Sequence, residues 1–98
     1  MVTKLRRSTG NVFADLGFEP EEAEHLRIRA ELMIALSKAL EARGLTQVQA
    51  AKLLGVSQPR VSDLRRGKID RFSIDTLVTM LGHAGVKVTF TTKTARVA

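Results

Sequence analysis

The sequence has no cysteine, only two histidines, and no long apolar run among its 98 residues. Without cysteine it can form neither a disulfide scaffold nor a thiolate metal site, and His25 and His83 alone argue against a histidine-built metal site. The apolar runs are a few residues long, whereas a membrane span needs about 20. No apolar segment with a cleavage site opens the chain. We therefore expect a single soluble, cytoplasmic domain with no metal and no cofactor.

The usual groupings of catalytic residues are also missing. Ser62 and Asp63 together with a histidine could suggest a hydrolase, but no nucleophile elbow, oxyanion loop or third triad member accompanies them. We expect the protein not to be an enzyme and to have no small-molecule substrate.

Charge is distributed unevenly along the chain. Residues 1–42 carry six basic and seven acidic side chains, a net charge of −1, whereas residues 43–98 carry ten basic and three acidic ones, a net charge of +7. A basic half of this kind is typical of proteins that bind a polyanion such as DNA. The other interpretation is a surface whose charge only keeps the protein in solution.

Apolar spacing predicts an all-α fold with five helices. A single turn after Asn11 would form a hook that docks Phe13 and Phe18, and Pro20 would begin a long helix that ends at Gly44. Three shorter helices would follow. The first would pack Val48, Ala51 and Leu54 inward, and residues 68–72 would form a connecting loop before the last. The predicted capping residues of these three helices are Thr46, Ser57 and Ser73.

The long helix has two apolar rows instead of one. The first contains Leu26, Ala30, Met33, Leu36 and Leu40, and the second contains Ile28, Leu32, Ala35 and Ala39. Either both rows are buried within the monomer, or the N-terminal half of the helix meets a partner.

After Gly85 the apolar spacing changes from a helical period to an alternating one. Val86, Val88 and Phe90 alternate with polar residues, which predicts a short β-strand. A lone strand leaves its backbone groups unpaired, so we expect an edge from a second copy or from a partner. We favour a homodimer interface made by these three residues.

The stretch TQVQAAKLLGVSQPRVSDLRRG, residues 46–67, predicts two short helices joined by a tight turn at Gly55. If Val61 and Leu64 face the core, the opposite face of the second helix carries Pro59, Ser62, Asp63 and Arg66, with Gln58 at its exposed tip. Such a tip suits the major groove, where Gln can bond adenine and a proline ring can touch a thymine methyl.

The segment GLTQVQAAKLLGVSQPRVSDLRRGK resembles the helix-turn-helix of XRE, or lambda-repressor-like, regulators. The resemblance implies a five-helix domain over residues 21–85, after an N-terminal arm and hook in residues 1–20 and before a strand and tail in residues 86–98. It implies base contacts by Gln58, Pro59 and Asp63, to which the outward face of the helix adds Ser62. Phosphates repel the Asp63 carboxylate unless it accepts from cytosine N4 or is held by Arg60 or Arg66. The resemblance also implies phosphate contacts by Gln47, Arg66 and Lys68, and we extend this group to Ser57 and Arg60. Arg65 and Arg71 adjoin the same helix and form either an ordinary solvated turn or, as we favour, further phosphate contacts.

A wider pattern, NVFADLGF, then PEEAEHLRIRAELM, then KIDRFSIDTLVTMLGHAGVKV, resembles HigA-type antitoxins that accompany RelE/HigB-like toxins. It implies a repressor that binds a palindromic double-stranded operator and neutralises an mRNA-cleaving toxin. The expected toxin interface is the apolar set in the acidic half: Phe13, Phe18, Leu26, Ile28 and Leu32. The alternatives are a stand-alone repressor without a toxin and a protein-interaction module that touches no DNA.

Overall fold

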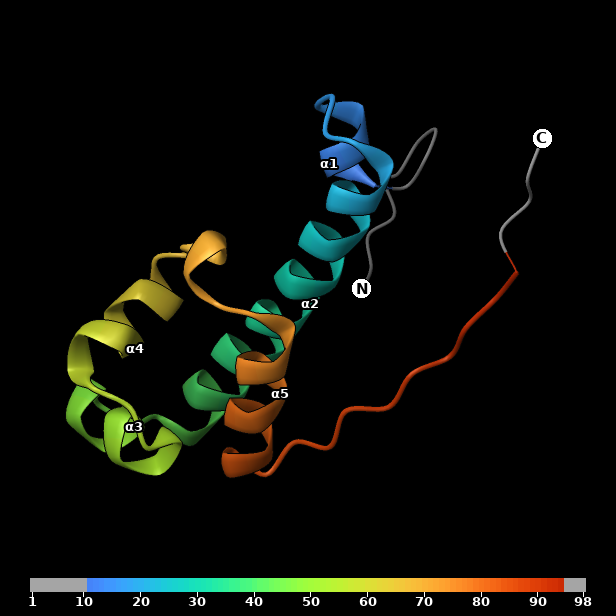
Figure 1. Cartoon of the computed structure of the whole chain (residues 1–98). Helices are drawn as coiled ribbons and strands as arrows, with labels where there is room; N and C mark the ends of the chain where they lie inside the picture. The colour runs from blue at the N-terminus through green and yellow to red at the C-terminus, as the bar shows by residue number, and fades with distance from the viewer. Residues whose placement is uncertain (1–10, 95–98) are drawn as a thin grey trace.

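The computed structural model describes residues 11–94, and this range contains helices and irregular segments only (Figure 1). Its elements in chain order are α1 (Val12–Asp15), α2 (Pro20–Arg43), α3 (Gln47–Leu54), α4 (Gln58–Arg65), η1 (Ile69–Arg71) and α5 (Ile74–His83), of which η1 is a 3-10 turn. The prediction of five α-helices is confirmed. The N-terminal arm up to residue 10 and the last four residues lie outside the described range.

α2 is the axis on which the other elements are arranged. Pro20 occupies its first turn with two glutamates, as the helix dipole favours, and Gly44 ends it with a left-handed φ of 62°. α5 lies beside the C-terminal half of α2, and α3 and α4 form a hairpin next to this pair (Figure 1). α1 folds back on the N-terminal end of α2, which projects beyond the other helices.

The main core lies between the C-terminal half of α2 and the helices α3 to α5. Its largest fully buried side chains are Phe72, Leu36, Leu40, Leu64, Leu77, Met80, Leu81 and Val61. Leu32, Ala35 and Ala39 of the second apolar row pack against this core and are partly buried. For this half of α2, both rows are therefore covered within the monomer.

α3, α4 and α5 begin in the same way. The hydroxyls of Thr46, Ser57 and Ser73 each accept a hydrogen bond from the backbone N–H three residues later, so the predicted caps are confirmed. An apolar residue precedes each cap and a buried residue follows four positions after it: Leu45 and Ala50, Val56 and Val61, Phe72 and Leu77. This spacing is that of a hydrophobic staple, which fixes the angle at which the chain enters a helix.

Two side chains lie differently from what helical spacing predicts. We expected Phe72 in a connecting loop and Val48 in the core, but Phe72 is 1% exposed and Val48 is 54% exposed. Ala50 is fully buried in α3 in place of Val48, because the face of α3 that meets α4 and α5 is set by Ala50, Ala51 and Leu54.

The predicted β-strand after Gly85 is wrong. No strand occurs in residues 11–94, and residues 86–94 leave α5 as an irregular segment. The physical reason is that this part of the chain contains no second extended segment whose backbone could pair with it. Val86 and Val88 instead pack against the core, while Phe90 is 75% exposed. Two of the three alternating residues therefore face the core, without strand pairing.

No helix within residues 11–94 is both long enough and apolar enough to cross a membrane.

Truncating Phe72 should destabilise the fold more than truncating an exposed apolar residue. Phe72→Ala leaves a cavity in the main core and should lower the free energy of unfolding by about 3–5 kcal/mol. Val48→Ala removes a side chain that is 54% exposed and should change it by less than about 0.5 kcal/mol. Urea unfolding followed by circular dichroism measures both values, and similar losses for the two variants would contradict the assignment of Phe72 to the core.

Candidate nucleic-acid interface

The turn between α3 and α4 is built by local interactions. Thr46 Oγ1 accepts from the backbone N–H of Gln49 at 3.2 Å, and Gln49 Oε1 accepts from the N–H of Thr46 at 2.9 Å, so α3 begins with a complete capping box. Gly55 ends α3 with a φ of 70°, a conformation that costs a residue with a Cβ about 1 kcal/mol or more. α4 then begins three residues later.

α4 presents one face to the core and one to the outside. Val61 and Leu64 are fully buried, and Pro59 occupies the first turn, where its missing N–H costs no hydrogen bond. The predicted base-contacting side chains lie on the other side. Gln58 and Pro59 are exposed, and Ser62 and Asp63 are partly exposed. These four residues share one accessible face, and their contact with DNA stays a prediction.

The first turns of α3 and α4 are joined by the side chain of Gln47. Its Nε2 donates to the backbone carbonyl of Gln58 at 3.3 Å. This contact brings the predicted phosphate-binding Gln47 and Ser57 beside the tip of α4, where helix N-termini favour an anion. A phosphate bound here would lie next to Gln58.

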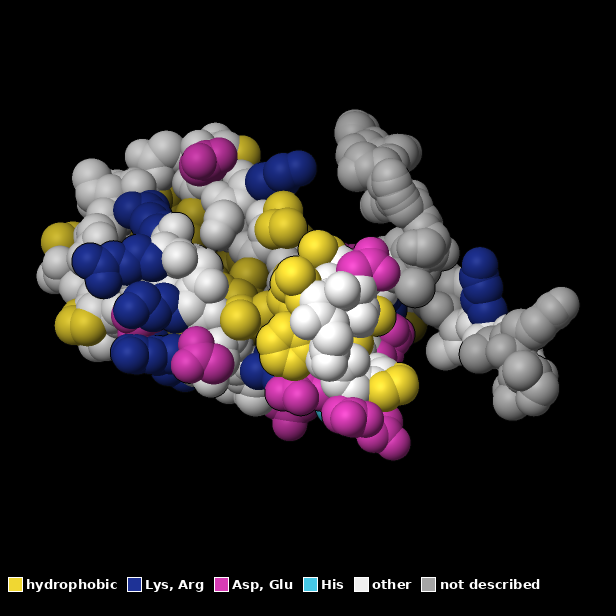
Figure 2. Space-filling view, turned by 90° about the horizontal axis from the view of Figure 1, so that it is seen from above, with side chains coloured by type: hydrophobic (Ala, Val, Ile, Leu, Met, Phe, Trp, Pro, Cys, Tyr) yellow, Lys and Arg dark blue, Asp and Glu magenta, His cyan; other side chains and the backbone are white. Residues whose placement is uncertain are grey.

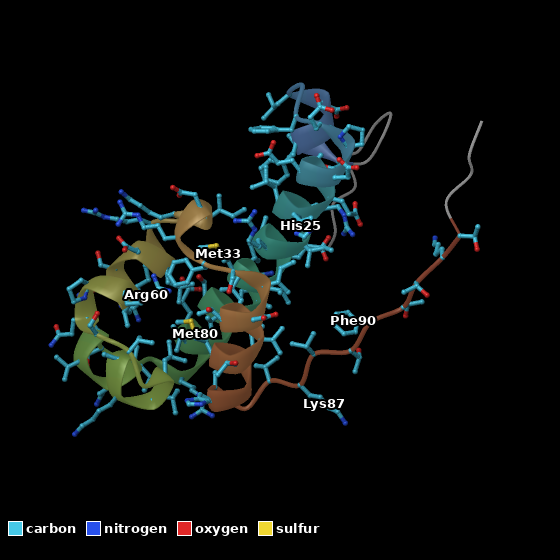
Figure 3. The ribbon with its side chains drawn as sticks, in the orientation of Figure 1. His25, Met33, Arg60, Met80, Lys87 and Phe90 are labelled. Atoms are coloured by element: carbon cyan, nitrogen blue, oxygen red, sulfur yellow. The ribbon has the colours of Figure 1, made fainter. Side chains whose placement is uncertain are left out.

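Arg60, which we predicted to contact phosphate, lies against the core. Its guanidinium carbon lies 4.5 Å from the centroid of the Phe72 ring, and its Nη1 donates to the carbonyl of Arg71 at 3.0 Å. Figure 3 shows Arg60 on the core side of α4. A guanidinium stacked on an aromatic face is attracted by the ring quadrupole. Arg60 therefore links α4 to η1 in this structure.

Arg71, for which phosphate contact is predicted from its place close after α4, lies against that helix, and its contact with Asp63 was not predicted. Its Nη1 lies 3.2 Å from Asp63 Oδ2, and the Arg71 side chain is 51% exposed while that of Asp63 is 20% exposed. The two residues are eight positions apart in different elements, so no helical spacing connects them. The sequence feature that indicates this contact is the staple at Phe72, because burial of the Phe72 side chain brings Arg71 close to α4.

The remaining cations near α4 differ in how they are held. Arg65 donates from Nη2 to the carbonyl of Leu45 at 3.2 Å, which ties the end of α4 to the start of α3. Arg66 is exposed and Lys68 is partly exposed, and both follow directly on α4. Figure 2 shows Lys and Arg side chains gathered on one side of the molecule, whereas carboxylates surround the end where α1 lies.

The opposite end of the molecule has an apolar tip formed by α1 and the residues after it. Asn11 caps α1 through Oδ1 and donates from Nδ2 to the carbonyl of Ala23 at 3.3 Å, and the Phe13 and Phe18 rings meet edge to face at 6.2 Å. Val12, Leu16 and Phe18 remain 60%, 69% and 41% exposed. We call these three residues the α1 tip.

Only part of the predicted toxin interface is accessible. Phe18 is exposed, and Phe13 and Ile28 are partly exposed. Leu26 is only 8% exposed, and Leu32 packs against the main core. These two positions of the prediction need correction, because a partner that docks on the intact fold can reach little of Leu26 and only the uncovered part of Leu32.

The N-terminal half of α2 is acidic, and Arg27, one of its two arginines, is paired with two of its glutamates. Arg27 bonds Glu24 at 2.6 Å and Glu31 at 2.7 Å. The hydrogen bond from Arg27 holds the pKa of the Glu24 carboxyl below its ordinary value, and the same contact raises the pKa of Arg27. Glu24 therefore stays ionised at neutral pH, and Glu19, Glu21 and Glu22 are exposed close to it.

The predicted dimer residues fall into two groups. Val86 and Val88 are partly buried against the protein's own core, whereas Phe90 stands clear of the helices on the C-terminal segment (Figure 3). Phe90 is therefore the main apolar group that this segment offers to a second molecule.

Comparisons with known proteins place the whole described chain in one family. A family model described as a helix-turn-helix domain matches residues 12–93, from α1 to the C-terminal segment. A solved structure provisionally assigned as an XRE-family transcriptional regulator is 32% identical, with a TM-score of 0.72 over 79% of this chain and 90% of that chain. The comparison with curated proteins found no match.

Proposed function

The chain belongs to the helix-turn-helix family of XRE-type regulators, and from this premise we propose that it is a DNA-binding transcriptional repressor. The observation that carries the proposal is the outward face of α4, which presents Gln58 at its tip beside exposed cations. An α-helix of this kind fits the major groove of B-DNA, which is about 12 Å wide. The net charge of +7 over residues 43–98 supports binding to the phosphate backbone.

The residues of the interface would divide the work between bases and phosphates. Gln58 suits adenine N6 and N7, Pro59 suits a thymine methyl, and Ser62 can bond either kind of base. Gln47, Ser57, Arg66 and Lys68 would contact phosphates around the tip of α4. These contacts fix the register of the protein on the duplex, while the base contacts select the sequence.

We propose that the repressor acts as a homodimer on a palindromic operator. One α4 helix covers too little DNA for tight binding, whereas two related by a twofold axis would read half-sites about 34 Å apart. The C-terminal segment with Phe90 supports this arrangement, because it carries a large apolar side chain that its own core leaves 75% exposed.

Binding to DNA should depend on salt, and Gln58 and Arg66 should affect it differently. Each phosphate that a Lys or Arg of the bound chain neutralises should add about −0.9 to the log–log slope, measured on a duplex selected by the protein from a random library. Gln58→Ala should cost about 1–3 kcal/mol on the selected duplex and little on a random-sequence duplex. Arg66→Ala should weaken both equally and reduce the slope by about one.

Equal losses for Gln58→Ala on the two duplexes would show that Gln58 reads no base. No salt-dependent binding to any duplex would reject the repressor and favour a module that binds proteins only.

Phe90→Asp should weaken self-association, because it places a carboxylate where the proposed dimer buries an aromatic ring. Analytical ultracentrifugation over a range of concentrations measures the effect. Ile34→Asp, which changes an exposed apolar residue of α2, is the matched control and should sediment like the unmodified protein. If the Phe90 variant also sediments unchanged, the C-terminal segment does not form the dimer.

A second candidate function, favoured by the α1 tip, adds the role of antitoxin. Val12, Leu16 and Phe18 are exposed, and so are Glu19, Glu21, Glu22 and Glu24 that follow them in the chain. Figure 2 shows apolar and acidic side chains together at this end of the molecule. An apolar patch with a carboxylate rim suits a basic protein partner, because the carboxylates attract a positively charged surface and repel an acidic one. A RelE/HigB-like ribonuclease has the required charge, and the repressor would then regulate its own operon.

Leu16→Asp should abolish neutralisation of such a toxin while leaving DNA binding intact. The assay is growth on co-expression with the product of a neighbouring RelE/HigB-like reading frame, with Ile34→Asp as the control that should still neutralise. Neutralisation by the Leu16 variant would remove the α1 tip from the interface. If no neighbouring product is toxic, the stand-alone repressor holds.

A further inference from the structure

The ion pair between Asp63 and Arg71 gives an outward-facing carboxylate of α4 a role other than base reading. Asp63 lies on the face of α4 that the proposed function directs toward DNA, where phosphates repel an unpaired carboxylate. Its Oδ2 is instead 3.2 Å from Arg71 Nη1, and its side chain is 20% exposed. The inference below rests on the proposed function, because it concerns how this face meets the duplex.

Arg71 is a cation beside α4 whose position is fixed by local contacts while its side chain stays half exposed. Arg60 stacks on Phe72, and its Nη1 is bonded to the Arg71 carbonyl at 3.0 Å. This bond fixes the backbone of Arg71, and Asp63 holds the far end of its side chain. A guanidinium has five N–H donors, and the contact with Asp63 is made by Nη1 alone. With its side chain 51% exposed, Arg71 retains donors for a second oxygen ligand.

We propose that Asp63 is a positioning residue that holds the Arg71 guanidinium against a DNA phosphate beside α4. Arg71, at the end of η1, then contributes a phosphate contact that the helix-turn-helix segment itself does not contain. Asp63 and the phosphate bind different N–H groups of one planar guanidinium, which suits Arg and not Lys. The positive charge between them also offsets the repulsion between carboxylate and phosphate.

The competing role for Asp63 is direct reading of cytosine, whose N4 can donate to a carboxylate. The two roles differ in what happens when Arg71 is absent. A base-reading Asp63 contributes to the selected duplex only, with or without Arg71. A positioning Asp63 acts on every duplex and acts through Arg71, so its effect disappears when Arg71 is removed.

The test is a double-mutant cycle of Asp63→Ala and Arg71→Ala, with binding to the library-selected duplex and to a random-sequence duplex measured over a salt series. Arg71→Ala should weaken binding to both duplexes by the same factor and reduce the log–log slope by about one. Asp63→Ala should weaken both by about threefold or more when Arg71 is present. In the Arg71→Ala background it should cause no further loss.

Three further variants separate positioning from stability and from net charge. Arg71→Lys should keep the salt slope but lose the dependence on Asp63, because an ammonium lacks the planar fork. Asp75→Ala removes the same charge elsewhere and should not weaken binding. Asp63→Asn keeps the shape of the side chain and should behave like Asp63→Ala. Thermal midpoints should stay close to that of the unmodified protein, since exposed ion pairs contribute little to stability.

A loss on Asp63→Ala that is confined to the selected duplex, or that is the same with and without Arg71, would overturn the inference and leave the proposed repressor in place. An unchanged salt slope for Arg71→Ala would do the same. If the unmodified protein binds neither duplex, the proposed function fails and the inference fails with it.

Discussion

The geometry of the surface around α4 depends on the burial of Phe72. Its ring lies in the main core at 1% exposure, and the guanidinium of Arg60 covers it at 4.5 Å. Because Phe72 directly precedes the cap of α5, the same side chain fixes where η1 ends and α5 begins. α4 is thus held by Val61 and Leu64 on its inner face and by an Arg60 contact to the adjoining segment.

α2 separates two surfaces of opposite character. Its C-terminal half is covered by α3, α4 and α5, whose outer sides carry the cations, while its N-terminal half projects with α1 and a carboxylate rim (Figures 1 and 2). A polyanion and a basic protein would be attracted to different ends of one small domain. The projection of α2 places the two surfaces at different ends of the domain.

The sequence predicted what is decided locally and missed what depends on contacts between elements. Thr46, Ser57 and Ser73 could be recognised because a cap and its N–H partner are three residues apart. Phe72 lies outside any helical period, and only its staple with Leu77 indicates that it belongs to the core. The contacts of Arg60 and Asp63 join α4 to residues 11 and 8 positions later, and no spacing rule predicts them. The strand prediction was wrong because an alternating pattern also arises when an irregular segment packs some of its side chains on the core. A strand needs, in addition, a second extended segment with which its backbone can pair.

Asp63 illustrates why the chemistry of one residue type is not enough to assign a role in recognition. A carboxylate on a groove-reading helix is unfavourable near phosphates unless it accepts from a base or is paired. The sequence left both possibilities open, with Arg60 and Arg66 as the candidate partners on the same helix. The fold provides a third candidate partner, Arg71, because the burial of Phe72 brings η1 close to α4. The packing of the core therefore determines which cation lies beside Asp63, and the proposed role of the Asp63 carboxylate depends on that contact.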